Sequence, residues 1–470
     1  MSTIKPKIGP PLHRGKLVGL EVEVPPSEDV DLTIKLPKEL IAEIFSHCVM
    51  ETINLGALEL VDSPWNLAQI CSSWRTVALS SPNLWNDIAV QFPYHRRGEF
   101  VHLMNLLEIF LSRAGNSSIS LNITAAVDEY PLDPKLVDSI VNLIHPHIGQ
   151  FRHLGLQPVG AMMPILQLPS DTVQALESAS LVFDKDDCDN IFDRGERDGW
   201  PEAAEINRIT IFNTARNLRY VTLMTEYAEV YLNVLRFPWP QLTHLTLPNT
   251  FLEFQSAHEV LRQCTSLVSF NFGIDTDWNC WPLDSPTILH NLVSLTVYAF
   301  DPCCNHGLFL QPFILPSLRY LELCSEHTTP WTDGEIIALI RRSSHANFEC
   351  FRFASLLPHE VLAALSEAPL LKELSLSFPL STFGEEPLVL DALITAVARG
   401  DLVPNIQTFN LEFQDTTSNH GLRKLIKVQC RPEEMQQGFR DFWIKLRNQD
   451  LESVDVILEV DGEVWGINGS

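Results

Sequence analysis

The side chains best suited to metal or nucleophilic chemistry lie in a few short clusters. Cys303, Cys304 and His306 place two thiols and an imidazole within four residues. A tetrahedral zinc site takes spaced cysteines and a second Cys/His pair, and the neighbouring sequence offers neither. His145-Pro146-His147 is interpreted as a loop. These residues therefore do not predict a metal site.

An aspartate-rich stretch begins at Asp184 and resembles a calcium loop only at first sight. An EF-hand loop takes oxygen ligands at positions 1, 3 and 5 and a glutamate at position 12. Counted from Asp184, the fifth position is Cys188 and the twelfth is Gly195, so the pattern fails. The chain also has no Gly-rich phosphate loop, no GxSxG and no HExxH. The sequence predicts a protein that is not an enzyme and has no cofactor.

Composition narrows the class of partner. The 470 residues include 59 acidic and 33 basic ones, for a formal charge of −26. Such a protein repels phosphates, so no nucleic-acid partner is expected. No apolar run is long enough to span a bilayer, and the first 20 residues lack a signal core, so we expect no membrane partner and an intracellular location, in cytoplasm or nucleus. The ten cysteines contain no CxxC pair and are expected to be reduced.

A repeated hexad, L-x-x-L-x-L with other apolar residues allowed, organises most of the chain. It begins at Leu218, Leu242, Leu267, Leu292 and Leu318, at intervals of 24, 25, 25 and 26 residues. Further matches begin at Phe348, Leu371 and Ile406, and weaker ones at Phe151 and Leu451. This period and pattern are the signature of leucine-rich repeats.

The repeats predict a curved parallel sheet backed by helices. Alternation as in Leu245-Thr246-Leu247 turns two apolar side chains to one face of a strand and a polar one to the other. Helical stretches at 256–264, 334–342 and 359–368 lie between hexads, and neighbouring units must stack to bury their apolar sides. A helix at 103–111 with a strand at 119–123 forms an irregular first repeat. A helix at 435–446 and a strand at 451–458 form a cap, and the acidic stretch 184–205 is an exposed loop.

The N-terminal segment predicts a small helical domain before the repeats. Leu36, Leu40, Ile41, Ile44 and Phe45 form one apolar helix face that starts at Pro37. A second helix carries Leu67, Ile70, Trp74 and Val77, and Ser81-Pro82 ends it. We therefore predict a disordered leader at 1–31, a helical domain at 32–90 and a repeat domain at 91–470.

Three motifs in this segment resemble the F-box: Leu-Pro-x-Glu-Leu at 36–40 followed by Ile44-Phe45, Cys-x-x-Trp at 71–74, and Pro-x-Leu-Trp at 82–85. With the repeats behind them, the chain resembles F-box/leucine-rich-repeat proteins, in particular the expanded F-box-like family of mushroom-forming fungi. It carries 25 residues between Phe45 and Cys71, several more than the compact animal form of the motif. The fold class expected is α/β, with a small N-terminal helical F-box-like domain followed by a leucine-rich-repeat solenoid.

The resemblance implies the substrate-recognition subunit of an SCF-type ubiquitin ligase. Its F-box would bind a Skp-type adaptor and, through it, a cullin. The positions implied to contact the adaptor are Leu36, Pro37, Leu40, Ile44, Phe45, Leu67 and Trp74.

The repeats would bind an unidentified protein target. The third and fifth hexad positions, and the residue after the sixth, are expected to face the concave side. The predicted target-binding residues are Tyr220, Thr222, His244, Thr246, Asn271, Tyr298, Tyr320, Glu322, Arg352, Glu373 and Asn410. Two alternatives stay open: a leucine-rich-repeat scaffold or sensor without ligase function, and an enzyme with an unrecognised site.

Overall fold

The structure of the protein is a computed structural model. It describes residues 36–49, 52–55, 64–92, 97–125, 134–183, 209–225, 229–230, 232, 235–248, 251–252, 254–274, 285–299, 310–325, 334–343, 348–354, 357–379, 387–399, 401–414, 428–430, 456–459 and 464–467.

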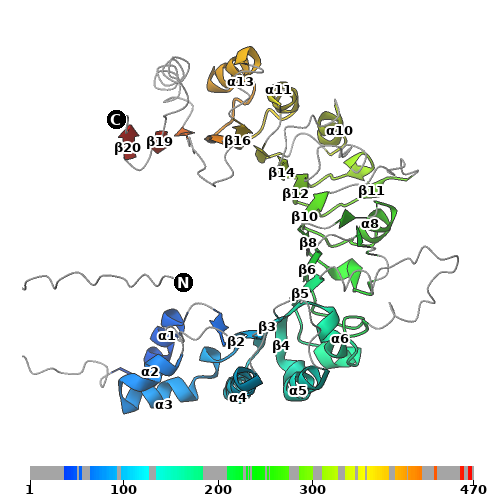
Figure 1. Cartoon of the computed structure of the whole chain (residues 1–470). Coiled ribbons are helices and arrows are strands. Elements are labelled where there is room, and N and C mark those ends of the chain that lie inside the picture. Colours follow the sequence, from blue (N-terminus) through cyan, green and yellow to red (C-terminus); the bar gives the residue numbers. More distant parts are fainter. Residues whose placement is uncertain are drawn as a thin grey trace, which may run out of the picture.

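One fourteen-stranded sheet runs through the molecule and curves into an arc (Figure 1). Every neighbouring pair of strands is parallel except the last, in which β18 pairs antiparallel with β17. In spatial order the strands are β1 (Ile53–Asn54), β2 (Asp87–Phe92), β3 (Ile119–Ala125), β4 (Phe151–Gln157), β5 (Ser178–Phe183), β6 (Tyr220–Thr225), β8 (His244–Leu247), β10 (Ser269–Ile274), β12 (Ser294–Ala299), β14 (Tyr320–Ser325), β15 (Cys350–Ala354), β16 (Glu373–Pro379), β17 (Thr408–Gln414) and β18 (Val428–Cys430). A long parallel sheet built from a repeated unit is consistent with a leucine-rich-repeat-like solenoid.

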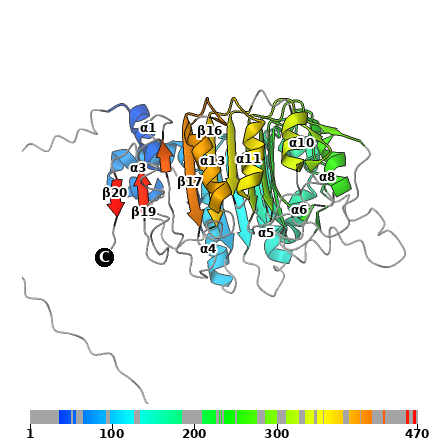
Figure 2. The same ribbon diagram turned by 90° about the horizontal axis from the view of Figure 1, so that it is seen from above.

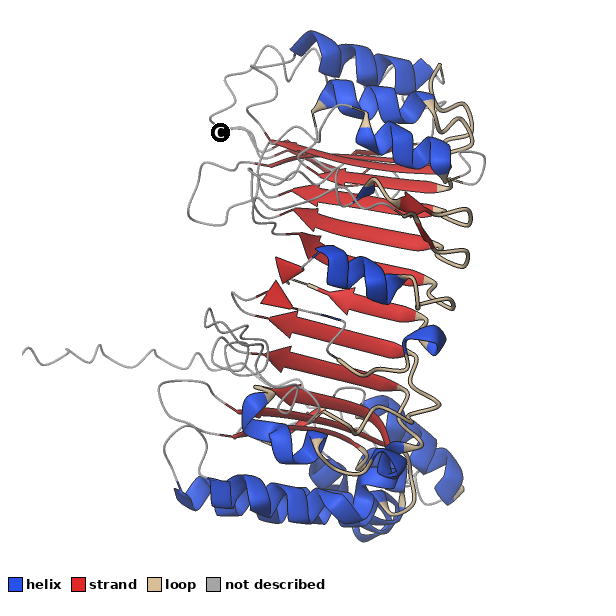
Figure 3. Ribbon diagram, turned by 90° about the vertical axis from the view of Figure 1, so that its right-hand side faces the viewer, coloured by secondary structure: helices blue, strands red, loops and turns tan. Residues whose placement is uncertain are grey.

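Helices cover the outer, convex side of this sheet and leave the strands to line the inside of the arc (Figures 1 and 2). They are α4 (Arg97–Ala114), α5 (Pro134–Ile144), α6 (Met163–Leu166), α8 (Phe254–Leu261), α10 (Glu335–Arg342), α11 (Pro358–Ser366) and α13 (Pro387–Arg399). The predicted helices at 103–111, 256–264, 334–342 and 359–368 correspond to α4, α8, α10 and α11. Figure 3 shows the strands side by side along the arc. Neighbouring units of such an array bury each other's apolar residues.

The hexads place the strands as predicted. The five regularly spaced hexads, and those at Phe348, Leu371 and Ile406, each begin two residues before a strand. Their first, fourth and sixth residues are buried, as Leu242, Leu245 and Leu247 illustrate with no exposed surface. Full burial of each such leucine contributes about 1.5–3 kcal/mol, so each repeat depends on its neighbours for its stability.

Some strands were not predicted. β5 follows Leu176, where Ala179 stands at the fourth hexad position, and this small residue hid the repeat although Ala179 is buried. β1 and two short parallel pairs were also missed: β7 (Glu229–Val230) with β9 (Phe251–Leu252), and β11 (Thr287–Ile288) with β13 (Phe313–Ile314). Strands this short carry no period-2 pattern that a sequence could reveal.

The C-terminal end differs from the predicted cap. The strand expected at 451–458 is β19 (Val456–Glu459), and it pairs antiparallel with β20 (Val464–Ile467) in a separate sheet. Because β20 follows β19 after a short loop, pairing these two strands has a small entropic cost. The free edge of β17, where the predicted strand could have paired, is taken by β18. The predicted helix at 435–446 lies outside the described residues, as do the leader 1–31, the acidic stretch at 184–205 and the Cys303–His306 cluster.

Three helices precede the repeats: α1 (Lys38–Cys48), α2 (Pro64–Ile70) and α3 (Ser72–Ser80). The single second helix expected from Leu67 to Val77 is thus two helices. The chain is extended at Cys71, whose sulfur accepts a hydrogen bond from the Trp74 amide and so caps α3. The predicted boundary between residues 90 and 91 falls inside β2, and the division into these domains stays a prediction.

Candidate functional site

The apolar side chains of α1 divide into a buried and an exposed set. Ile41 and Phe45 are 3% and 0% exposed and belong to the core. Leu36, Leu40 and Ile44 are 38%, 52% and 47% exposed. Leu40 and Ile44 are four residues apart and therefore lie on one side of α1, and Leu36 lies two residues before the helix begins. We call them the α1 ridge.

The other predicted adaptor contacts are distributed between surface and interior. Pro37 is exposed at the start of α1. Leu67 and Trp74 are half-buried and pack against the core. Phe45 is fully buried, with its ring centroid 4.9 Å from that of Trp74, so its side chain supports the ridge from below.

Two exposed side chains were not among the predicted contacts. Ile70 at the end of α2 is 61% exposed, and Leu79 on α3 is 39% exposed. Ile70 belongs to the apolar pattern of the second predicted helix, which would bury it. In the structure that helix is interrupted at Cys71, and Ile70 ends α2 as an exposed residue.

An aromatic cluster joins the N-terminal helices to the first repeat. Trp85 is fully buried, with ring centroids 5.0 Å from Trp65 on α2 and 4.9 Å from Phe110 on α4. Its indole nitrogen donates a 2.8 Å hydrogen bond to the Ala78 carbonyl of α3. The guanidinium of Arg113 lies over both tryptophan rings, 4.2 Å and 4.3 Å from their centroids. The N-terminal helices and the repeats therefore share one packed core.

The concave face carries all eleven predicted target-binding residues. In the strand pairing, Tyr220, His244, Tyr320 and Glu373 share the row of third hexad positions. Thr222, Thr246, Asn271, Glu322, Arg352 and Asn410 share the fifth-position row, and Tyr298 lies one step further along its strand. All eleven are half-buried or exposed. They extend from β6 to β17, which is too wide a range for one small contact.

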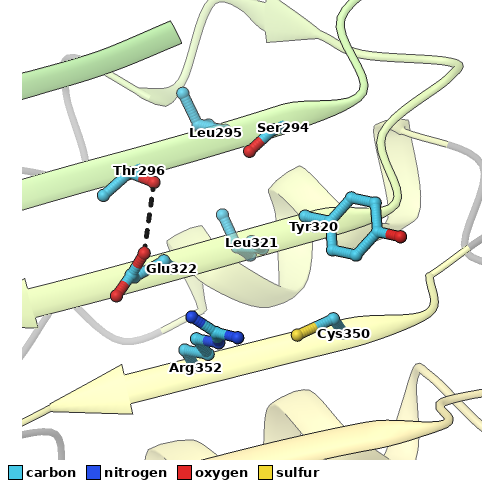
Figure 4. A pocket seen from close by; sticks show the side chains of 8 residues that line it. All are labelled: Ser294, Leu295, Thr296, Tyr320, Leu321, Glu322, Cys350 and Arg352. Carbon is cyan, nitrogen blue, oxygen red and sulfur yellow. Dashed lines mark hydrogen bonds between the residues drawn. The ribbon is translucent and has the colours of Figure 1, made fainter. Parts of the chain in front are cut away.

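Part of this face is hollowed into a pocket of about 150 Å³ across β12, β14 and β15 (Figure 4). Its lining residues are Ser294, Leu295, Thr296, Tyr320, Leu321, Glu322, Cys350 and Arg352. Ser294 and Cys350 were not among the predicted contacts, although both stand at third hexad positions and the same rule would find them.

The polar groups of the pocket form short chains of contacts. Thr296 Oγ1 donates to Glu322 Oε2 at 3.3 Å, the bond drawn in Figure 4. Arg352 Nη2 donates to Glu373 Oε1 at 3.0 Å. This bond to the carboxylate raises the pKa of Arg352.

The two thiols nearest to Glu322 and Arg352 are protonated at neutral pH. Burial, with the nearby carboxylate of Glu322, raises the pKa of Cys324 to about 12. Burial also raises the pKa of Cys350 to about 11, with Glu373 adding to the shift. Because the thiolate is the nucleophilic form, neither cysteine is set up for covalent chemistry. The arrangement is suited to binding.

A second aromatic feature lies on β6 and β8. The rings of Tyr220 and His244 stack at 4.5 Å, and the Thr243 hydroxyl lies 2.9 Å from His244 Nδ1. Burial lowers the pKa of His244, which favours the neutral ring in this stack.

His153 on β4 makes the stability of the array depend on pH. Its Nε2 lies 2.9 Å from Asn122 Oδ1, to which it donates a hydrogen bond because that oxygen can only accept. Burial lowers the pKa of His153, an effect that Asp87 partly opposes. The folded protein therefore binds this proton at lower pH than the unfolded chain does.

We expect the free energy of unfolding to fall as the pH drops below about 6.5, the ordinary histidine pKa, since the unfolded chain then binds more protons. Urea denaturation of the wild type and of His153→Gln at about pH 7.5 and about pH 5.5 measures this effect. The wild type should lose more stability than the variant on acidification. An equal loss in both proteins would contradict the assignment to His153.

Neither protein-family models nor curated protein sequences match this chain. Across the described ranges, no three His, Cys, Asp or Glu side chains come together as a group that could hold a metal ion. None of the helices described is long and apolar enough to cross a membrane.

Proposed function

We propose that the protein is the substrate-recognition subunit of an SCF-type ubiquitin ligase, in which α1–α3 form an F-box-like domain that docks on a Skp-type adaptor. The observation that carries the proposal is the α1 ridge. Three large aliphatic side chains, Leu40 and Ile44 on α1 and Leu36 just before it, stay exposed, while Ile41 and Phe45 of the same helix are buried in the core. An apolar helix side with its members at four-residue spacing is a common form of protein-docking surface.

The concave face would bind the target protein. The strands that carry its polar and aromatic rows line the inside of the arc (Figure 1), and the residues of these rows are half-buried or exposed. Aromatic side chains such as Tyr220 and Tyr320, both exposed, are favoured anchors in protein interfaces.

The contribution of this chain is to hold two partners at a defined separation. The aromatic cluster around Trp85 and the sheet that continues from β1 into the repeats connect the two surfaces within one core. A target held on the concave face then meets ubiquitin, delivered by the other subunits, at high effective concentration.

Co-purification of the full chain with a Skp-type adaptor tests the proposal, with the adaptor alone on the same resin as the control. A stoichiometric complex is the expected result. A folded chain that forms none would contradict the ligase function and favour the scaffold or sensor alternative, in which target binding persists without the adaptor.

A further inference from the structure

The pocket between β12 and β15 holds a carboxylate that the fold leaves without an ion pair. Glu322 is half-buried, and its described partners are the neutral groups Thr296 Oγ1, at 3.3 Å, and Cys324 Sγ, at 3.9 Å. Among the described residues, no cationic nitrogen lies within ion-pair distance of Glu322. A charged group in this partly desolvated position gains more from a partner than one in open water does.

The cation next to Glu322 already has its own partner. Arg352 is paired with Glu322 in the strand register, and the Glu322 charge contributes to its raised pKa, yet its guanidinium hydrogen-bonds to Glu373 on the other side at 3.0 Å. Together the three side chains carry one positive and two negative charges. The net charge of this group is therefore negative, and the pocket is better suited to a cationic ligand than to an anionic one.

Aromatic side chains lie in and next to the same pocket. Tyr320 precedes Glu322 by two residues on the same strand face, lines the pocket and is 44% exposed (Figure 4). Tyr298 lies on the neighbouring strand, and burial together with Glu322 raises its pKa, so its hydroxyl stays neutral. Aromatic faces beside an acid are favourable surroundings for a flat cation.

We propose that this pocket binds an arginine side chain presented by the target protein. The planar guanidinium can donate two parallel hydrogen bonds to the Glu322 carboxylate, in a pocket that Tyr320 lines at its other end (Figure 4). It loses less hydration than a lysine ammonium on entering a half-buried site. The inference deepens the proposed function, because it rests on the concave face being the target-binding surface.

The test uses the full chain and N-acetyl-arginine amide as the probe, with binding followed by saturation-transfer NMR. Glu322→Gln keeps the shape of the side chain and removes its charge, and it should weaken binding by about tenfold, as loss of a charge-assisted hydrogen bond does. The matched control is Glu177→Gln. Glu177 forms an ion pair with Arg152 outside the pocket. Glu177→Gln removes one negative charge, as Glu322→Gln does, but it should leave the affinity for N-acetyl-arginine amide unchanged.

Two further comparisons decide the sign of the ligand charge. The neutral probe N-acetyl-glutamine amide should bind the wild type weakly. Its affinity should not exceed the affinity of N-acetyl-arginine amide for Glu322→Gln. Arg352→Gln removes the competing cation and should retain or strengthen arginine binding. The proposal is overturned if Glu322→Gln binds the probe as the wild type does, or if the wild type does not prefer arginine to glutamine amide. It is also overturned if N-acetyl-aspartate amide binds instead and Arg352→Gln abolishes that binding.

Adaptor co-purification of the same variants separates this proposal from the proposed function. Glu322→Gln should bind the adaptor as the wild type does, since the pocket and the α1 ridge lie on different parts of the arc. A chain that binds arginine through Glu322 but no adaptor would refute the ligase function and keep the pocket. A chain that binds the adaptor but shows no effect of Glu322→Gln would refute the pocket alone.

Discussion

Replacing Leu40 by aspartate should weaken binding of a Skp-type adaptor by about thirtyfold to a thousandfold, since loss of a central interface anchor costs about 2–4 kcal/mol. Leu40 is the most exposed member of the α1 ridge and lies between Leu36 and Ile44. A carboxylate there would have to be desolvated against an apolar partner surface, which adds to the loss. Isothermal titration of the full chain with the adaptor measures the change.

The folded state should tolerate this substitution. Leu40 is the third residue of α1, where a negative charge interacts favourably with the helix dipole, and half of its side chain already lies in water. We expect the unfolding free energy to change by less than about 0.5 kcal/mol. Leu388→Asp is the matched control, because Leu388 on α13 is 74% exposed and far along the chain from the ridge. Equal adaptor affinity for Leu40→Asp and Leu388→Asp would contradict docking through the ridge.

Replacing Trp85 by alanine should lower the free energy of unfolding by about 3–5 kcal/mol, the usual cost of removing a large buried aromatic side chain. The change removes the contacts with Trp65 and Phe110, the hydrogen bond to Ala78 and one of the two rings beneath Arg113. Arg113 would then lie next to a cavity, with part of its burial no longer compensated. Urea denaturation followed by tryptophan fluorescence and by circular dichroism measures the loss.

Leu79→Ala controls for truncation at the surface of the same region. Leu79 is partly exposed, so its loss should cost less than about 1 kcal/mol. Comparable destabilisation by Trp85→Ala and Leu79→Ala would contradict a large contribution of the aromatic cluster to stability. A selective loss of signal from the N-terminal helices in Trp85→Ala, with the repeats retained, would locate the effect at this junction.

The repeat array was predictable because each unit restates the same local rule. The hexad at Leu242 sets which side chains of β8 are buried, and the first, fourth and sixth residues are likewise buried in every hexad from Leu218 to Ile406. The prediction failed where one residue broke the pattern, as Ala179 does in β5. Its burial is set by neighbouring strands that a single hexad does not reveal.

The α1 ridge shows the limit of a helical pattern. Leu36, Leu40, Ile41, Ile44 and Phe45 appeared as one apolar face in the sequence. In the structure, Trp74 and the core cover Phe45 and Ile41, while the three ridge residues stay uncovered. Helical periodicity predicts which side chains lie on the same side of a helix. How many of them are buried depends on how much of that side the neighbouring helices cover.

The sequence alone determined the repeat period, the strand positions at the strong hexads and the face on which each target-binding candidate lies, because these depend on local alternation along the chain. Only the tertiary structure decided that Arg352 forms its ion pair with Glu373 and not with Glu322, its neighbour in the strand register, and that Trp85 links α2, α3 and α4. Such relations join residues from different strands and helices. They depend on register and packing across the fold, and no local pattern contains that information.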